Sequence, residues 1–251
     1  MASRLSFPST YFFLLMKAYP LLPSRHRSTW WYLMGLLLAG MPLLAQPVLV
    51  KDINKADPSL SSDGSSSDGL GQSNLISANG LLYFWVDDAV HGNEIWRSNG
   101  TAAGTFLLKD IFPGTGGSKA EGFTVVNGVV YFVADNGVHG PELWKTDGTA
   151  AGTVLVKDIY PGAAGGSPGG FVNLNGVLYF GANDGVHGRE LWKSDGTAAG
   201  TTLVKDICPG ADGSVVSLAN RNGTLLLSAY EPNTGYELWK SNGTAAGTVL
   251  V

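Results

Sequence analysis

Residues 190–207 read ELWKSDGTAAGTTLVKDI, and close copies of this string begin at Glu94, Glu142 and Glu237. Successive tryptophans of the four copies are 48, 48 and 47 residues apart, and they are Trp96, Trp144, Trp192 and Trp239. Four copies of so long a string do not arise by chance. The chain is therefore a repeat protein with a unit of about 48 residues.

Each unit contains four runs of β-forming residues separated by turn residues. In the third unit we expect strands over 171–174, 177–182, 189–194 and 201–207. The first two runs are joined by Asn175-Gly176, which is typical of a two-residue hairpin turn because glycine readily takes positive φ. Four short antiparallel strands repeated in this way predict an all-β fold, namely a β-propeller of four-stranded blades.

The hairpin made by the last two strands has a register that can be counted. If Asp195 and Gly200 flank its loop, Trp192 lies opposite Leu203. The same register places a glutamate opposite a lysine in three units, as Glu94 with Lys109, Glu142 with Lys157, and Glu190 with Lys205. We therefore expect half-exposed cross-strand ion pairs, each worth about 0.2 to 1 kcal/mol.

The second strand of each unit predicts how the units pack. Tyr179 and Phe180 are neighbours in the sequence, so they point to opposite faces of their sheet. Aromatic side chains on both faces indicate that both faces are buried, as they are when blades stack face to face.

These motifs are similar to those of a known family. Glu-Leu-Trp-x-x-Asp-Gly-Thr, followed by Ala-Ala-Gly-Thr and Leu-Val-Lys-Asp-Ile, resembles the repeat of the ELWxxDGT family, exported bacterial proteins inferred to form propeller-like arrays. The resemblance covers roughly residues 48–251 and implies secretion and a surface or extracellular role, but it brings no established catalytic residues. The departures are Ile95 for Leu, Asn99 and Asn242 for Asp, and Thr234-Gly235 for His-Gly.

The repeat domain, residues 46–251, begins and ends with incomplete units. Residues 48–53 match a fourth strand without its first three, and residues 249–251 match half of a fourth strand. This pattern predicts an incomplete ring from a larger propeller. A closed four-bladed ring is the alternative, in which 48–53 and 247–251 compete for the same edge.

Residues 1–45 have the composition of a secretory signal peptide. They contain four basic and no acidic residues, and an apolar run from Trp30 to Leu44 precedes Ala45, after which we expect cleavage. An uncleaved anchor is the alternative, but a run of about 15 residues interrupted by Pro42 is shorter than the roughly 20 needed to span a bilayer. We therefore expect a secreted, periplasmic or cell-surface protein without a stable membrane span, whether translation starts at Met1, Met16 or Met34.

Charge and cysteine content exclude several classes of protein. Cleavage after Ala45 leaves 12 basic residues against 20 acidic ones, which argues against a nucleic-acid partner. The single cysteine, Cys208, allows no intramolecular disulfide and is expected to be a small apolar filler and not a reactive thiol. The expected partner is an extracellular protein or glycan, and no cofactor is predicted.

Candidate chemistry is sparse. His91, His139 and His187 recur in one turn of three units, where we expect them to cap the turn; metal binding is the alternative, although equivalent turns of a ring lie too far apart for one ion. Asp147 and Asp195 could ligate Ca²⁺ but are expected to cap their own turns. No nucleophile elbow, zinc-protease motif or phosphate loop is present.

We therefore predict no catalytic residue and no metal ligand. The predicted function is that of a non-enzymatic binding or surface-scaffold module. The alternatives are a propeller-based enzyme of glycosidase or lyase type and a Ca²⁺-binding surface adhesin.

The connections between units differ most from copy to copy. They are expected to share one face of the propeller with the histidine turns, and ligands usually bind on such loops. The candidate ligand residues on that face are Lys55, Asp63, Lys119, Glu121 and Asp212.

Overall fold

The computed structural model describes residues 48–53, 75–210 and 214–251. The signal segment 1–45 and the candidates Lys55, Asp63 and Asp212 lie outside these ranges. All described residues after Val48 belong to one compact unit, residues 49–251. Within the described ranges the regular structure is β-strand, and no helix is long and apolar enough to cross a membrane.

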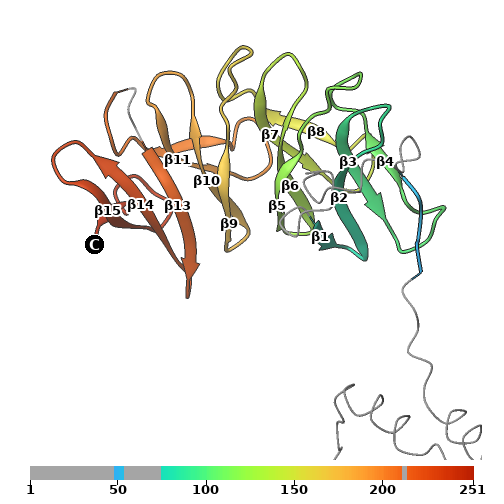
Figure 1. The fold of residues 1–251 in the computed structure, drawn as a ribbon. Coiled ribbons are helices and arrows are strands. Elements are labelled where there is room, and N and C mark those ends of the chain that lie inside the picture. The colour runs from blue at the N-terminus through green and yellow to red at the C-terminus, as the bar shows by residue number, and fades with distance from the viewer. Residues whose placement is uncertain (1–47, 54–74, 211–213) are drawn as a thin grey trace, which may run out of the picture. The chain divides into compact units, whose positions relative to one another are not determined.

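The strands form four four-stranded sheets, one for each repeat unit (Figure 1). The first sheet consists of β1 (Leu75–Ala78), β2 (Leu81–Asp87), β3 (Asn93–Ser98) and β4 (Phe106–Lys109). The second consists of β5 (Glu121–Val126), β6 (Val129–Asp135), β7 (Pro141–Thr146) and β8 (Val154–Lys157). The third consists of β9 (Gly169–Leu174), β10 (Val177–Asn183), β11 (Arg189–Ser194) and β12 (Thr202–Lys205). The fourth consists of β13 (Ser214–Arg221), β14 (Thr224–Glu231), β15 (Gly235–Ser241) and β16 (Val249–Leu250).

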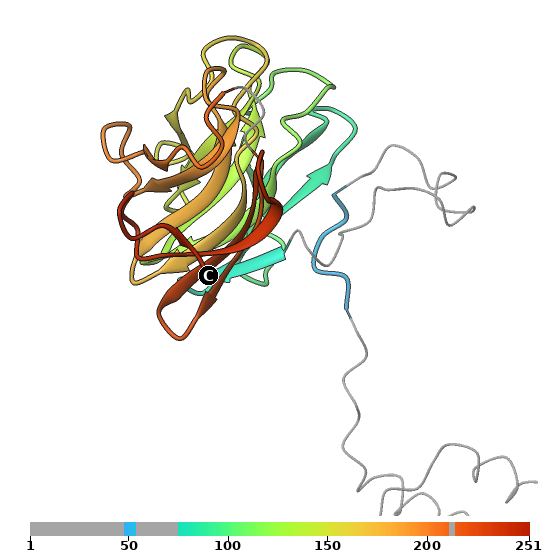
Figure 2. The same ribbon diagram turned by 90° about the vertical axis from the view of Figure 1, so that its left-hand side faces the viewer.

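Every sheet is an antiparallel meander, which confirms the predicted blade topology. One parallel pair, Arg189 with Ser214, links the third sheet to the fourth. Figure 2 looks from the side of the fourth sheet and shows the earlier sheets behind it. Among the described strands no pairing joins the first sheet to the last, so the predicted four-stranded blades are present but no closed ring is detected.

The predicted Asn-Gly hairpin turns are confirmed. In the third sheet Asn175 has φ 53° and Gly176 has φ 81°, and positive φ at both central residues defines a type I′ turn. The asparagine side chain also links sheets, because Asn127 Nδ2 donates to the Gly176 carbonyl oxygen over 3.0 Å.

The hydrophobic core lies between successive sheets. Trp144 of the second sheet packs in one cluster with Ile95 of the first, and Trp239 of the fourth packs with Leu191 of the third. Tyr131 and Phe132 are both buried and belong to different clusters. Both faces of the inner sheets are therefore covered, as the sequence predicts.

The predicted glutamate–lysine ion pairs are wrong. Trp192 does lie opposite Leu203, but a β-bulge between Leu191 and Trp192 places Leu191, and not Glu190, opposite Lys205. The same shift occurs at Lys109 and Lys157. The bulge adds one residue to the fourth strand, so the lysine is shifted by one position and no longer faces the glutamate.

The lysine instead bonds to the following sheet. Lys205 Nζ donates to the Thr248 carbonyl oxygen over 2.8 Å and lies 5.4 Å from the ring centroid of Trp239. Lys109 and Lys157 make the equivalent hydrogen bonds to Thr153 and Thr201.

Candidate ligand-binding face

The turn between the third and fourth strands of each sheet is closed by its own side chains. Asp195 Oδ1 accepts hydrogen bonds from the backbone N–H and the hydroxyl of Thr197, at 2.8 and 2.7 Å. The Thr197 hydroxyl oxygen accepts from the Gly200 N–H, and the Thr201 hydroxyl donates to the Thr197 carbonyl oxygen. The Asp-Gly-Thr-Ala-Ala-Gly-Thr string is thus a self-satisfied turn, as the capping prediction required.

Asparagine serves equally well at the first position of this turn. Asn99 and Asn242 accept from the threonine two residues later in the same way. Because the amide oxygen replaces the carboxylate without loss of contacts, the turn does not depend on charge. Among the described residues no group of three or more His, Cys, Asp or Glu side chains is arranged to hold a metal ion.

A second turn, between the second and third strands, contains the recurring histidine. We call residues 88–92, 136–140 and 184–188 the histidine turns. In the third, Asp184 Oδ1 accepts from the N–H groups of Val186 and His187, and Asp184 Oδ2 lies 2.7 Å from His187 Nδ1. Each histidine contacts the first residue of its own turn, which confirms the capping role.

Hydrogen bonding shifts the pKa values of this pair in opposite directions. The bond to Asp184 raises the pKa of His187, and Asp88 raises the pKa of His91 in the same manner. Burial pushes the pKa of Asp184 upward, but the hydrogen bonds from His187 and Val186 outweigh it and lower this pKa. Aspartate and histidine therefore hold the turn in one conformation as a charge-assisted pair.

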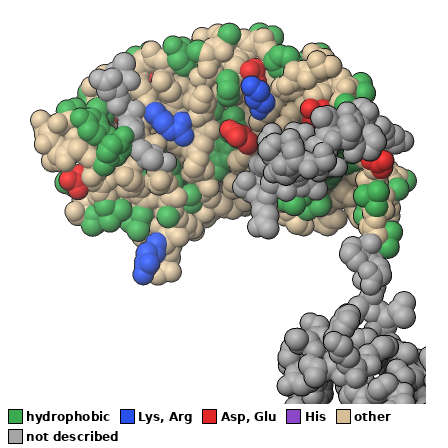
Figure 3. Space-filling model, in the orientation of Figure 1, with side chains coloured by type: hydrophobic (Ala, Val, Ile, Leu, Met, Phe, Trp, Pro, Cys, Tyr) green, Lys and Arg blue, Asp and Glu red, His purple; other side chains and the backbone are tan. Residues whose placement is uncertain are grey.

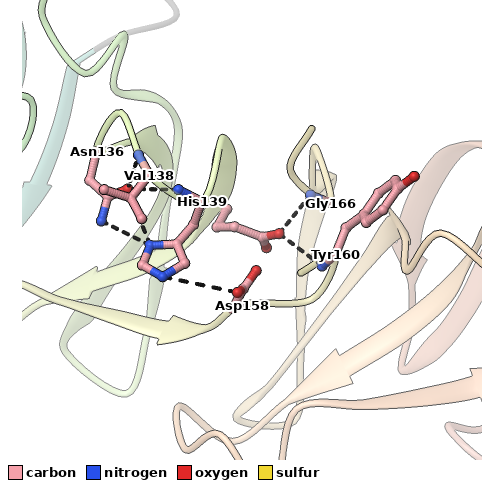
Figure 4. Close-up of polar contacts among 7 residues, drawn as sticks. Asn136, Val138, His139, Asp158, Tyr160 and Gly166 are labelled. Atoms are coloured by element: carbon pink, nitrogen blue, oxygen red, sulfur yellow. Dashed lines mark hydrogen bonds and ion pairs between the residues drawn. The ribbon is translucent and has the colours of Figure 1, made fainter. Parts of the chain in front are cut away.

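The glutamate of each repeat holds the connection to the next sheet. We call these connections the crossovers: residues 110–120, 158–168 and, in its described part, 206–210. Glu142 is fully buried, and its Oε1 accepts from the N–H groups of Tyr160 and Gly166 at 2.9 and 2.6 Å (Figure 4). Figure 4 also shows Asp158, at the start of this crossover, facing His139, with 4.0 Å between Oδ2 and Nε2.

The other inner glutamates play the same part. Glu94 accepts from the N–H groups of Phe112 and Ser118 and from the Ser118 hydroxyl. Glu190 accepts from the N–H groups of Ile207 and Cys208. This role was not predicted from the sequence, although each glutamate precedes its crossover by a constant spacing that could have indicated it.

Burial perturbs the protonation of these carboxyls. It raises the pKa of Glu190 to about 7 against the lowering effect of the N–H groups of Ile207 and Cys208, and it also raises the pKa of Glu94 and Glu142. A raised carboxyl pKa can mark a catalytic acid. Here the side chains are fully buried and bonded to backbone, so the shift accompanies a structural role.

The first two crossovers each lie between two histidine turns. The N–H of Lys119 donates to the Asn93 carbonyl oxygen next to the first turn, and the N–H of Asp135, before the second turn, donates to the Ser118 carbonyl oxygen. In the next crossover the Tyr160 ring lies so close to Gly185 that a side chain there would collide with it. Crossovers and histidine turns therefore form one surface, which we call the loop face.

The structure describes two of the five predicted ligand residues. Lys119 is exposed on a crossover in a left-handed conformation, with φ 53°. Glu121, at the start of β5, is also exposed and lies two residues further along. Lys119 and Glu121 are close because they are two residues apart in the chain. Their neighbours Ser118 and Ala120 are buried, so this part of the crossover is packed into the fold.

The loop face also carries exposed apolar residues that the sequence analysis did not single out. Val90, Val138 and Val186 occupy the same position of the three histidine turns and are 64%, 62% and 67% exposed. The available signal was an apolar residue kept in a tight turn in three copies. Figure 3 shows that charged side chains on the side seen in Figure 1 are few and separated.

No protein-family model and no curated protein matches the sequence. Solved structures with a similar fold include puromycin hydrolase, at 15% identity and a TM-score of 0.44, over 67% of this chain and 27% of that chain. They also include an endo-arabinase from Bacteroides thetaiotaomicron, at 13% identity and a TM-score of 0.36, over 71% of this chain and 78% of that chain. The catalytic domain of an α-L-arabinofuranosidase from Coprinopsis cinerea matches at 14% identity and a TM-score of 0.33, over 74% and 69% of the two chains.

These neighbours correct the prediction that the chain is not an enzyme. They are named as a puromycin hydrolase, an endo-arabinase and an α-L-arabinofuranosidase, all of which are enzymes. At 13 to 15% identity the likeness concerns the fold alone and assigns no activity to this chain. The chain spans about a quarter of the length of puromycin hydrolase.

Proposed function

We propose that this chain is an exported propeller-repeat protein, related to the ELWxxDGT family, that binds an extracellular protein or glycan through its loop face. The exposed valines Val90, Val138 and Val186 carry the proposal. Apolar side chains on rigid turns gain nothing from exposure to water, and binding residues are concentrated on loops that a rigid scaffold positions.

The Asp-Gly-Thr turns, at the other ends of the third strands, differ from the histidine turns. The Asp-Gly-Thr turns use their polar side chains on themselves, as Asp195 and Thr197 do, and place small alanines such as Ala198 at their exposed tips. These turns offer a partner little apolar area. The histidine turns combine a fixed backbone, a protruding valine and a partly exposed histidine, which is what a preorganised contact surface requires.

Binding by a matched pair of variants tests the proposal. The first variant carries Val90→Thr, Val138→Thr and Val186→Thr, which keep the shape of the turns and remove apolar surface. The control carries Ala102→Ser, Ala150→Ser and Ala198→Ser on the opposite turns. Arrays of extracellular glycans, including arabinan, and of extracellular proteins are probed with all three chains.

We expect the valine variant to lose at least about tenfold in affinity for the bound ligand, and the control to bind as the parent does. If the valine variant binds the ligand as tightly as the parent chain does, the loop face is not the binding site. Each glycan that binds is also incubated with the chain and assayed for new reducing ends, whose release would make the function hydrolytic.

The proposed export has its own test. Cleavage after Ala45 leaves a chain of about 21 to 22 kDa outside the cytoplasm. An immunoblot of fractionated cells measures size and compartment together. A cytoplasmic band would refute export, and with it an extracellular ligand.

A further inference from the structure

One residue of the third repeat is a cation at a position where the other repeats have none. Arg189 begins β11, directly after the third histidine turn. The equivalent residues of the first, second and fourth sheets are uncharged, and they are Asn93, Pro141 and Tyr236. A residue that breaks the repeat in a single unit is a candidate for a role specific to that unit.

A glycine makes room for this arginine inside the third sheet. Gly181 of β10 faces Gly169 of β9. A Cβ atom on Gly181 would lie 3.1 Å from the Val215 carbonyl oxygen and 3.2 Å from Arg189 Nε. Because any larger side chain would collide with these atoms, the guanidinium can lie against the sheet only while this residue is glycine.

The second glycine leaves a place open beside the guanidinium. A Cβ atom on Gly169 would lie 3.2 Å from Arg189 Nη2 and, apart from chain neighbours, within 4 Å of no other described atom. In the second sheet the residue at this position is Glu121. The third repeat therefore has no acidic side chain where the second repeat has one, directly next to its arginine.

The hydrogen bonds of Arg189 leave part of its guanidinium unused. An arginine carries five N–H donors. Arg189 Nε donates to the Val215 carbonyl oxygen over 3.1 Å, and Nη1 donates to the Ser167 carbonyl oxygen over 2.6 Å. Within the described part of the chain, Nη2 has no acceptor and no carboxylate lies within 4.0 Å of the guanidinium.

The electrostatics of this arrangement favour an anion. Burial lowers the pKa of the Arg189 guanidinium, which shows that the cation is partly removed from water. A partly desolvated charge that is bonded only to neutral carbonyl groups is stabilised by a counter-ion, and hydrogen bonds between two charged groups are the stronger kind. The planar fork of N–H groups matches the two oxygens of a carboxylate.

The arginine can be reached from the loop face. It follows the third histidine turn, and its partner Ser167 belongs to the crossover 158–168. Arg189 and Gly169 are partly buried, while Ser167 and Gly170 beside them are exposed. A ligand on the loop face can therefore contact the guanidinium without any change of the fold.

We propose that Arg189 binds a carboxylate group of the loop-face ligand, at the place beside Gly169 that a glutamate side chain takes in the second sheet. The fold itself indicates a carboxylate, because Glu121 carries this group from the equivalent position. The proposal rests on the proposed function for the place of the ligand, and it adds that the ligand is acidic.

The first test uses two small probes that have the same shape and differ in charge, acetate and acetamide. The full chain is titrated with each at constant ionic strength, and the backbone amide signals of Gly169 and Gly170 are followed by NMR. We expect acetate to shift these signals until they saturate, and acetamide to bind at least about tenfold more weakly.

A matched pair of arginine variants assigns the binding to one side chain. Arg189→Gln removes the cation and keeps a polar group, while Arg221→Gln does the same at an exposed arginine at the end of β13. We expect Arg189→Gln to bind acetate at least about tenfold more weakly than the parent, and Arg221→Gln to bind it as the parent does.

A third variant keeps the arginine and fills the place beside it. Gly169→Glu restores the residue of the second sheet, and Gly169 does not have the positive φ that would exclude a side chain. We expect this chain to stay folded and to lose acetate binding at least about tenfold, because its own carboxylate reaches Arg189 first.

Several results would overturn the proposal. Acetate that binds no better than acetamide is not held by its charge. Binding that survives Arg189→Gln or Gly169→Glu uses another site. Asp212 precedes Ser214, the pairing partner of Arg189, by two residues, so Asp212→Asn is titrated as well. Acetate binding that appears only in this variant would show that the chain supplies the carboxylate itself.

The valine variant separates this proposal from the proposed function. It keeps Arg189 and both glycines, so we expect it to bind acetate as the parent does. Loss of the large ligand with intact acetate binding would support both proposals. Acetate binding by a valine variant that keeps its full affinity for the large ligand would contradict the loop face alone.

Discussion

The third and fourth sheets contain the same motif in different surroundings. ELWKS occurs at Glu190–Ser194 and at Glu237–Ser241. In the third sheet its glutamate and leucine are fully buried, while in the fourth both are exposed. The tryptophan is buried in both, because it faces the preceding sheet. Burial at the Glu-Leu positions is therefore a property of the neighbour that follows and not of the motif itself.

The largest effect is expected at the leucine of this motif. Leu191→Ala should lower the free energy of unfolding by about 3 kcal/mol, since it leaves a cavity against Trp239. Leu238→Ala, at the exposed equivalent, should cost less than about 0.5 kcal/mol. Chemical denaturation of both chains measures the difference, and similar losses would break the comparison.

The glutamate pair should differ in pH dependence. Burial raises the pKa of Glu190 to about 7, above its usual 4.5, so the folded state holds this proton over a range in which the unfolded chain has released it. Stability from this group is complete below pH 4.5 and is lost as the pH rises through about 7, by about 2 to 3 kcal/mol.

Glu190→Gln should remove that part of the pH profile, and Glu237→Gln, at the equivalent exposed site, is the matched control for the substitution itself. Denaturation midpoints of the three chains between pH 4 and pH 8 provide the measurement. An unaltered profile in Glu190→Gln would show that this carboxyl titrates normally in the folded chain.

At the Asp-Gly-Thr turn we expect the third and fourth sheets to show the same loss of stability. Thr201 and Thr248 are both fully buried, and each donates its hydroxyl to a carbonyl within its own turn over 2.7 Å. Thr201→Val and Thr248→Val should each cost about 2 kcal/mol, because each removes two buried hydrogen bonds, one to the turn carbonyl and one shared with a serine hydroxyl. Unequal costs would mean that this turn also depends on the next sheet.

The smallest effect is expected at a lysine that links sheets. Lys193 Nζ donates to the Gly243 carbonyl oxygen over 3.1 Å, while the equivalent Lys240 is exposed at the last sheet. Lys193→Met should cost about 0.5 kcal/mol and Lys240→Met close to nothing. Thermal unfolding of the two variants would resolve this, and a larger loss for Lys240→Met would contradict it.

Local rules predicted much of this fold. Asn-Gly pairs, runs of β-forming residues and the Trp192–Leu203 register are encoded within one hairpin, and the structure has all three. The capping roles of Asp195 and His187 also depend only on residues within their own turns. These features could be derived because each is complete within a few residues.

Two features could not be derived, for physical reasons. A β-bulge leaves the residue pattern unchanged but shifts the register by one, so Glu190 could not be assigned to the crossover by counting. The exposure of Val186 depends on how the crossover packs beside its turn, which involves residues far from it in the sequence. The sequence pattern predicted the turns that form the loop face, but it did not predict which of their side chains are exposed.

The central claim is that each sheet is completed by the sheet and crossover that follow it. Hydrogen exchange of the full chain at the lowest practicable concentration tests it by comparing the amides of β11 and β15. These strands share the ELWKS motif, and local stability governs their exchange. We predict much slower exchange in β11, and equal protection of the two strands would contradict the account.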